Sequence, residues 1–128
     1  MILLLDTHAL LWFLGGDPRL STAARSAIED LANTRLFSIA SAWEIAIKAS
    51  LGKLALTAPF SQLIPGQLRA NGIELLPIRA EHVAPLLNLP YHHRDPFDRI
   101  LITQAVVENA VIVSADTTLD SYGISRLW

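Results

Sequence analysis

Four acidic residues of this sequence lie at positions that a parallel β-sheet would bring together. Asp6 and Asp116 each come just after a short apolar run, whereas Glu44 and Asp98 each lie in the predicted first turn of a helix. The carboxyl ends of parallel strands and the starts of the helices that follow them meet at one edge of such a sheet. We therefore expect these four carboxylates to gather at that edge.

Gathered carboxylates repel one another, and this repulsion predicts a bound cation. Two unit charges about 5 Å apart interact by roughly 3 kcal/mol at an effective dielectric constant near 20, a large share of a small domain's stability. The chain contains no cysteine, so the ligands on offer are carboxylate oxygens, the type that magnesium prefers, with manganese as a substitute. Such a site suits metal-assisted hydrolysis of a phosphodiester.

Each acid also has an ordinary structural role open to it. Asp6 and Asp116 can each cap the segment that follows, and Asp116 can instead form an Asx turn. Glu44 stands four residues before Lys48, the usual spacing of an ion pair on an exposed helix face. Taken singly, each of these structural explanations is as good as the functional one.

The stretch "HHRDPFDRI", residues 92–100, combines such a structural role with a surplus of titratable side chains. Asp95 as N-cap, Pro96 at the first helical position and Asp98 at the third make a favourable helix start. The helix dipole stabilises both carboxylates there. This explains where the helix begins, but not why two histidines and two arginines surround it.

The elements that must position these acids alternate between strand and helix. The predicted strands are 2–5, 35–40, 73–78, 111–116 and a short one at 124–128. The predicted helices are 7–14, 20–33, 41–54, a broken stretch at 59–72, 80–90 and 95–110. This alternation predicts an α/β fold with a mostly parallel sheet and helices on both of its faces.

Two of these helices carry more detailed predictions. The helix at 20–33 is expected to use Ser21 or Thr22 as its cap, and the helix at 41–54 to begin near Ser41 and end at Gly52. The apolar face of the first is expected to comprise Leu20, Ala24, Ala27, Ile28 and Leu31. Three aromatic residues are expected in the core: Trp12, Trp43 and Phe97.

Length and composition fit a single domain that spans residues 1–128. Hydrophobic residues make up 52% of the chain, yet no apolar run approaches the roughly 18–20 residues that cross a bilayer. The N-terminus lacks the basic start of a signal peptide, so we expect a cytoplasmic protein that begins at Met1 and has no membrane partner. Because the net charge is −2, a phosphate-bearing substrate must be held by a local patch or by bound cations.

Four segments of the chain together resemble a known family. They are "LLLDTHALLW", "SIASAWEIAIKASLGKL", "HHRDPFDRILITQA" and "VIVSAD", in the order typical of that family. With these segments the chain resembles the PIN-domain ribonucleases, specifically the VapC-like toxins of bacterial type II toxin–antitoxin pairs. The resemblance implies a three-layer α/β/α sandwich, magnesium-dependent endonucleolytic cleavage of RNA, and inhibition by a cognate antitoxin. The apolar stretches "LLWFL" and "FSQLIPGQL" fit a homodimer or an antitoxin interface, although core packing explains them equally well.

The resemblance also implies roles for individual residues. Asp6, Glu44 and Asp98 match the core acidic positions of the family, Asp116 matches the fourth, and Thr7 matches the hydroxyl residue beside the first acid. The four acids are therefore expected to be both the catalytic and the metal-binding residues.

Four side chains are candidates for contact with the substrate: Thr7, Lys48, Arg99 and His93. For the two basic residues, ion pairs with the acid four residues away, Glu44 and Asp95 respectively, are the simpler explanation. The histidine, like its neighbour His92, could contact RNA or donate a proton to the leaving oxygen. The alternative is that both are surface histidines of a loop.

Other functions fit the sequence less well. A haloacid-dehalogenase-like phosphatase needs a second aspartate two residues after the first, where this chain has His8, and a dinucleotide site needs a glycine-rich turn. The alternative from another class is a catalytically silent PIN-like protein-interaction module. Such a module would not be stabilised by magnesium, whereas an active site would.

Overall fold

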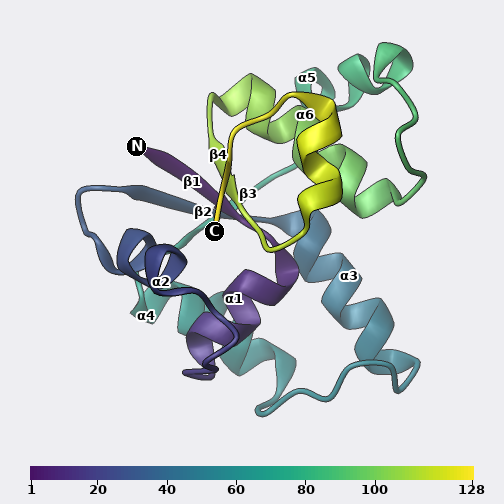
Figure 1. Cartoon of the computed structure of the whole chain (residues 1–128). Helices are drawn as coiled ribbons and strands as arrows, with labels where there is room; N and C mark the ends of the chain where they lie inside the picture. The colour runs from purple at the N-terminus through teal and green to yellow at the C-terminus, as the bar shows by residue number, and fades with distance from the viewer.

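The computed structural model describes residues 1–128 and confirms an α/β fold built on a parallel sheet (Figure 1). The strands are β1 (Ile2–Leu5), β2 (Thr34–Ser38), β3 (Glu74–Leu76), β4 (Val111–Val113) and β5 (Arg126–Leu127). Each neighbouring pair is parallel, and the order across the sheet is β3-β2-β1-β4-β5. The short C-terminal strand is thus confirmed as β5.

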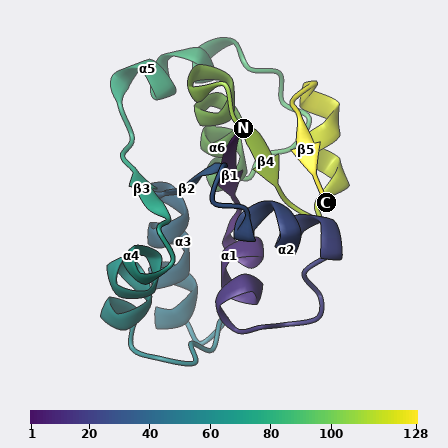
Figure 2. The same ribbon diagram turned by 90° about the vertical axis from the view of Figure 1, so that its left-hand side faces the viewer.

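Helices cover both faces of this sheet. They are α1 (Thr7–Leu14), α2 (Thr22–Glu29), α3 (Ile39–Ser50), α4 (Leu68–Ala70), α5 (Ala80–Val83) and α6 (Pro96–Glu108). Irregular helical segments are η1 (Gln62–Gln67), η2 (Ala84–Asn88) and η3 (Thr117–Tyr122). The helices α1, α2 and α4 gather on one side of the strands and α6 on the other (Figures 1 and 2), while α3 contacts both α1 and α6. This is the three-layer α/β/α sandwich implied by the resemblance.

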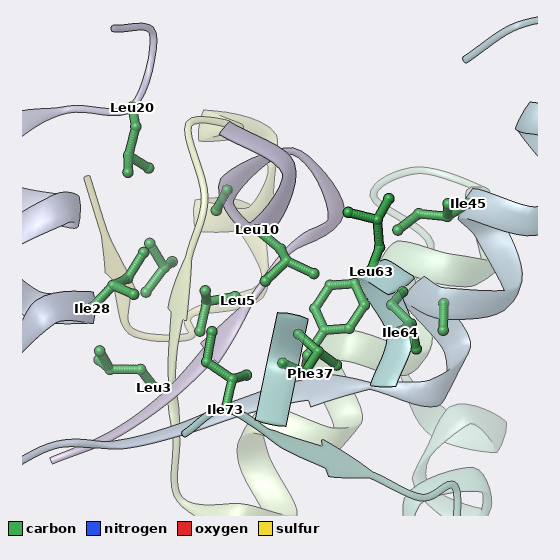
Figure 3. Close-up of a cluster of buried hydrophobic side chains, with 14 of the residues drawn as sticks. Leu3, Leu5, Leu10, Leu20, Ile28, Phe37, Ile45, Leu63, Ile64 and Ile73 are labelled. Carbon is green, nitrogen blue, oxygen red and sulfur yellow. The ribbon is translucent and has the colours of Figure 1, made fainter. Parts of the chain in front are cut away.

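Side-chain alternation along the central strand divides the core between the two faces. Leu3 and Leu5 of β1 point into a cluster with α1, α2 and η1 (Figure 3), whereas Leu4 packs in a second cluster with α6. Phe37 and Leu36 of β2 divide in the same way. Burial on both faces is why these strands are continuous apolar runs in the sequence.

The boundary between β2 and α3 differs from the prediction. The strand ends at Ser38, and α3 begins at Ile39, so the cap is Ser38 and not Ser41, which is buried inside the helix. The Ser38 hydroxyl accepts the Ala40 N–H at 3.0 Å, which satisfies a donor that the helix itself leaves free. The last pairing of β2 with β3 also falls at Ser38, opposite Leu76.

Two apolar side chains expected in the core lie at the surface instead. The helix α2 is capped by Ser21 but ends before Leu31, which is therefore 83% exposed. Trp43 is 61% exposed, because its neighbours on α3 fill the core in its place, while Trp12 and Phe97 are half-buried. None of the helices combines the length and the apolar character that crossing a membrane requires.

Candidate active site

Asp6 follows β1 and lies beside the end of β4. Its backbone N–H donates to the carbonyl of Val113 at 3.1 Å, which continues the pairing of the two strands. Its Oδ1 accepts the Ala9 N–H at 2.8 Å, so the residue also caps α1. Burial raises the pKa of this carboxyl and the Glu44 carboxylate adds to the effect, although hydrogen bonds from Ser114 and Ala9 oppose it. Asp6 therefore caps α1 and is also a buried acid at the carboxyl edge of the sheet.

Glu44 reaches the same edge from α3. It lies in the second turn of that helix and not in the first as predicted, because α3 starts at residue 39. The residue is only 7% exposed. Thr7 Oγ1 donates to Glu44 Oε1 at 2.5 Å, and Lys48 Nζ donates to Oε2 at 2.8 Å. Both oxygens thus have a donor, as a buried carboxylate requires. The predicted ion pair with Lys48 is confirmed, but at the candidate site and not on a solvated face.

Asp98 approaches from the third position of α6. Asp95 caps this helix as predicted, since its Oδ1 accepts the N–H groups of Phe97 at 2.9 Å and of Asp98 at 3.1 Å. Asp98 Oδ2 lies 3.1 Å from His93 Nε2. Burial raises the pKa of Asp98 to about 6, with the charges of Asp95 and Glu44 adding to the effect and His93 opposing it.

Three of the four predicted acids, Asp6, Glu44 and Asp98, interact electrostatically. The Glu44 carboxylate raises the pKa of both Asp6 and Asp98. Lys48 faces the cluster: its hydrogen bond to Glu44 raises its pKa, and the charges of Asp95 and Asp98 raise it further. One ammonium does not balance several carboxylates. The potential metal ligands are carboxylate oxygens, and their combined charge is negative, which fits a divalent cation such as magnesium.

Asp116, the fourth predicted acid, is exposed and serves as a cap. Its Oδ1 accepts both the N–H and the hydroxyl of Thr118, at 3.0 and 2.7 Å, at the start of η3. Its own N–H donates to Ser114 Oγ at 3.0 Å, and Ser114 is also hydrogen-bonded to Asp6. The buried Ser114, which sequence reasoning missed, is therefore the link between Asp116 and the cluster. The sequence feature that could have identified Ser114 is its position directly after β4.

Arg99 does not take either of its predicted roles. It is 5% exposed and forms no ion pair with Asp95. Its guanidinium donates to the carbonyls of Pro90 at 2.7 Å and Leu89 at 3.0 Å, and it lies 3.8 Å from the centre of the Tyr91 ring. A guanidinium engaged in this way is not free to contact a phosphate. It fixes the segment that leads into α6.

The remaining substrate candidates act on the acids themselves. Thr7 is buried with its hydroxyl on Glu44, and Lys48 is partly exposed. His93 is half-buried, and its Nδ1 lies 2.7 Å from the hydroxyl of Tyr122. Sequence reasoning missed Tyr122, which comes 29 residues after His93 and is brought to it by η3.

A second group of ligand-type side chains lies at the opposite end of α6. Glu81, His82 and Glu108 each bring a ligand atom within 4.8 Å of the others, a spacing that could hold a metal ion. Arg79 already binds all three side chains. Its guanidinium donates to Glu81 Oε1 at 2.7 Å and to Glu108, and its backbone N–H donates to His82 Nδ1 at 3.0 Å. The oxygens of the predicted acids do not form so tight a set.

Comparison with known proteins bears on this site. The family model of the PIN domain matches residues 3–124. Ribonuclease VapC16 of Mycobacterium tuberculosis is 39% identical over 71 residues, and this segment spans 52% of the chain but only 50% of that protein. Two solved structures share the fold at low sequence identity. VapBC2 from Rickettsia felis, bound to a promoter DNA fragment, superposes with a TM-score of 0.74 at 17% identity over 98% of this chain and 97% of that one. VapBC-1 from nontypeable Haemophilus influenzae superposes with a TM-score of 0.66 at 15% identity over 98% and 96%.

Proposed function

The chain belongs to the PIN domain family, and on this premise we propose that it is a magnesium-dependent endoribonuclease, the toxin of a toxin–antitoxin pair. The observation that carries the proposal is the gathering of Asp6, Glu44 and Asp98, from three different elements, at one edge of the sheet. The likeness to VapC16 and to the VapBC structures supports it. We place its action in the cytoplasm.

We assign each acid of this site a separate role. Asp6 and Asp98 are metal ligands in this proposal, Glu44 is a ligand or orients the attacking water, and Asp116 supports them through Ser114. Asp98 is suited to ligation because His93 engages its Oδ2, whereas its Oδ1 accepts no hydrogen bond from the protein. A magnesium ion, for which manganese can substitute, supplies the positive charge that activates water and stabilises the charged phosphodiester oxygens.

The neighbouring side chains support the acids and the substrate. Thr7 keeps Glu44 oriented through its hydroxyl. Lys48 also holds Glu44, and because it is partly exposed and faces Asp95 and Asp98, we assign it a contact with a phosphate of the RNA. A single lysine gives a weak local patch, so the bound cation must carry most of the attraction for the substrate.

The antitoxin is proposed to cover an apolar groove beside α1. A cavity of 440 Å³ lies there, lined by residues of α1 and by the segment 54–58, among them Leu11, Trp12, Leu54 and Leu56. The VapBC structures, whose fold this chain shares, support a partner of this kind. We also propose a homodimer, because large apolar side chains such as Leu87 are exposed. Light scattering of the purified chain, alone and with its antitoxin, measures both assemblies.

The proposal is tested by cleavage of a mixed cellular RNA pool by the purified chain, freed of any antitoxin. The reaction is run with magnesium, with EDTA, and with a folded Asp98→Asn variant. We expect discrete fragments that require both magnesium and Asp98. Glu29→Gln, which removes an exposed acid far from the site, is the matched control and should cut like the parent chain.

Two other outcomes would count against the proposal. Cleavage that survives both EDTA and Asp98→Asn would refute the carboxylate–metal mechanism. Folded chain that cuts no RNA and gains no thermal stability from magnesium would instead support the catalytically silent interaction module. The magnesium titration separates this second outcome from a nuclease with a narrow substrate, because a working site still binds the ion.

A further inference from the structure

Tyr122 places its hydroxyl at the centre of a hydrogen-bond network beneath Asp98. The hydroxyl oxygen accepts the backbone N–H of His93 at 3.2 Å and Nη1–H of Arg99 at 3.3 Å. It also lies 2.7 Å from His93 Nδ1, whose ring carries Nε2 to within 3.1 Å of Asp98 Oδ2. His93 and Arg99 therefore meet at one phenol oxygen, and the His93 ring connects that oxygen to Asp98.

The chemistry of these groups determines where the protons lie. A phenol has one proton to donate and two lone pairs to accept with, while a backbone N–H and a guanidinium can only donate. The N–H of His93 and the guanidinium of Arg99 fill the accepting positions, so the phenol proton goes to an acceptor. That acceptor is His93 Nδ1 at 2.7 Å, since the carbonyl of His93 lies farther away at 3.4 Å. With Nδ1 accepting, the ring proton is on Nε2 and points at Asp98.

We propose that Tyr122 is a positioning residue: it holds His93 in the tautomer that donates Nε2–H to Asp98 Oδ2, and so leaves Oδ1 turned to the proposed metal. The role rests on the proposed function, because Asp98 is the acid being placed. Other contacts hold the network in place: Arg99 also binds the carbonyls of the segment before α6, and the His92 and Tyr122 rings pack nearly perpendicular with their centroids 4.7 Å apart. The phenol therefore has little freedom to move away.

The direct test is the tautomer of His93. Long-range ¹⁵N–¹H correlations of the imidazoles, recorded on labelled chain in EDTA, distinguish a proton on Nε2 from one on Nδ1. The chain has four histidines, and the spectrum of His93→Gln identifies the signals that belong to His93. We expect the Nε2–H form in the parent chain and a mixture of tautomers in Tyr122→Phe, which keeps the ring and removes only the hydroxyl. A parent chain with the proton on Nδ1 would overturn the proposal.

The functional test uses Tyr122→Phe in two backgrounds. With His93 present, we expect kcat to fall about tenfold at unchanged KM and the affinity for Mg²⁺ measured by calorimetry to weaken by a similar factor. His93→Gln can still donate an amide N–H to Asp98 and has no tautomer to choose, so adding Tyr122→Phe to it should change nothing further. An equal loss in both backgrounds would show that the hydroxyl acts only on the fold, and would overturn the proposal.

Matched controls keep these outcomes separate. Tyr91→Phe removes an exposed phenol hydroxyl nearby and should leave kcat, Mg²⁺ affinity and the His93 tautomer unchanged. Thermal unfolding verifies that each variant is folded. If the parent chain neither cleaves RNA nor binds Mg²⁺, the proposed function fails, whereas the NMR spectra still decide whether Tyr122 sets the tautomer of His93.

Discussion

Replacing Asp98 with asparagine is expected to stabilise the chain against unfolding at neutral pH when no divalent cation is present. The pKa of this carboxyl is raised from 3.8 to about 6 in the folded chain, mainly by burial and by the charge of Asp95. The folded chain thus holds the proton more tightly than the unfolded chain does. The stabilisation that the protonated form provides is complete below pH 3.8 and is lost as the pH rises through about 6.

The size of the effect follows from that difference in pKa. A pKa about two units higher in the folded chain corresponds to about 3 kcal/mol at 1.36 kcal/mol per unit. This is an upper figure, because the Asp98 side chain keeps 28% of its surface in water. Asparagine has nearly the same shape and no charge, so Asp98→Asn should recover up to that amount above pH 6 and almost nothing at low pH.

Urea unfolding of both chains in EDTA, at about pH 4 and about pH 8, measures this difference. Adding magnesium is the control. It should stabilise the parent chain at the higher pH but not the variant, and should therefore reduce or reverse the difference in stability between the two chains. Glu29→Gln, an exposed acid with no buried partner, should match the parent chain at both pH values. An Asp98→Asn chain that is no more stable than the parent at about pH 8, or equally more stable at both pH values, would refute the electrostatic reasoning.

Three further substitutions test single contacts by urea unfolding. Thr7→Val leaves a buried Glu44 oxygen without its donor and should cost about 1–3 kcal/mol; no loss would mean that water replaces the hydroxyl. Arg99→Lys keeps the charge but loses the two-pronged contact with the carbonyls and the stacking on Tyr91, for a loss of about 2 kcal/mol. A value near zero there would mean that the segment before α6 is held by other contacts. Leu31→Ser should change the free energy of unfolding by less than about 0.5 kcal/mol, because Leu31 lies at the surface; a core-sized loss would contradict that position.

The sheet and the positions of Asp6 and Asp98 were predictable because they follow local rules. A short apolar run followed by an acid and a helix-forming stretch predicts both a buried strand and the edge at which its acid lies, and this located Asp6. The N-cap, proline and third-position pattern located the start of α6 and with it Asp98. These rules depend on neighbours within a few residues, which a single sequence shows in full.

The errors arise where distant contacts decide between local alternatives. Ser38 and Ser41 are equally good caps, and the helix starts at the earlier one because the pairing of β2 with β3 ends there. Arg99 was expected to contact a phosphate or to pair with an acid, yet its partners are backbone carbonyls, which any residue type can supply and which the sequence therefore does not reveal. Ser114 and Tyr122 join the site through contacts with residues far away in the sequence, and the residues adjacent to them in the sequence do not predict these contacts.

The direction of the pKa changes separates Asp6 and Asp98 from two acids that serve only the fold. Asp17 and Asp120 each pair with an arginine, and these hydrogen bonds lower the pKa of both carboxyls. Asp6 is also hydrogen-bonded, as the cap of α1, and that role by itself lowers the pKa of an acid. Burial nevertheless raises the pKa of Asp6 and of Asp98. Capping requires neither burial nor a second acid nearby, as the exposed Asp116 demonstrates. The chain therefore keeps two carboxylates where their charge is destabilising, and a bound cation at the carboxyl edge of the sheet is the simplest reason for it.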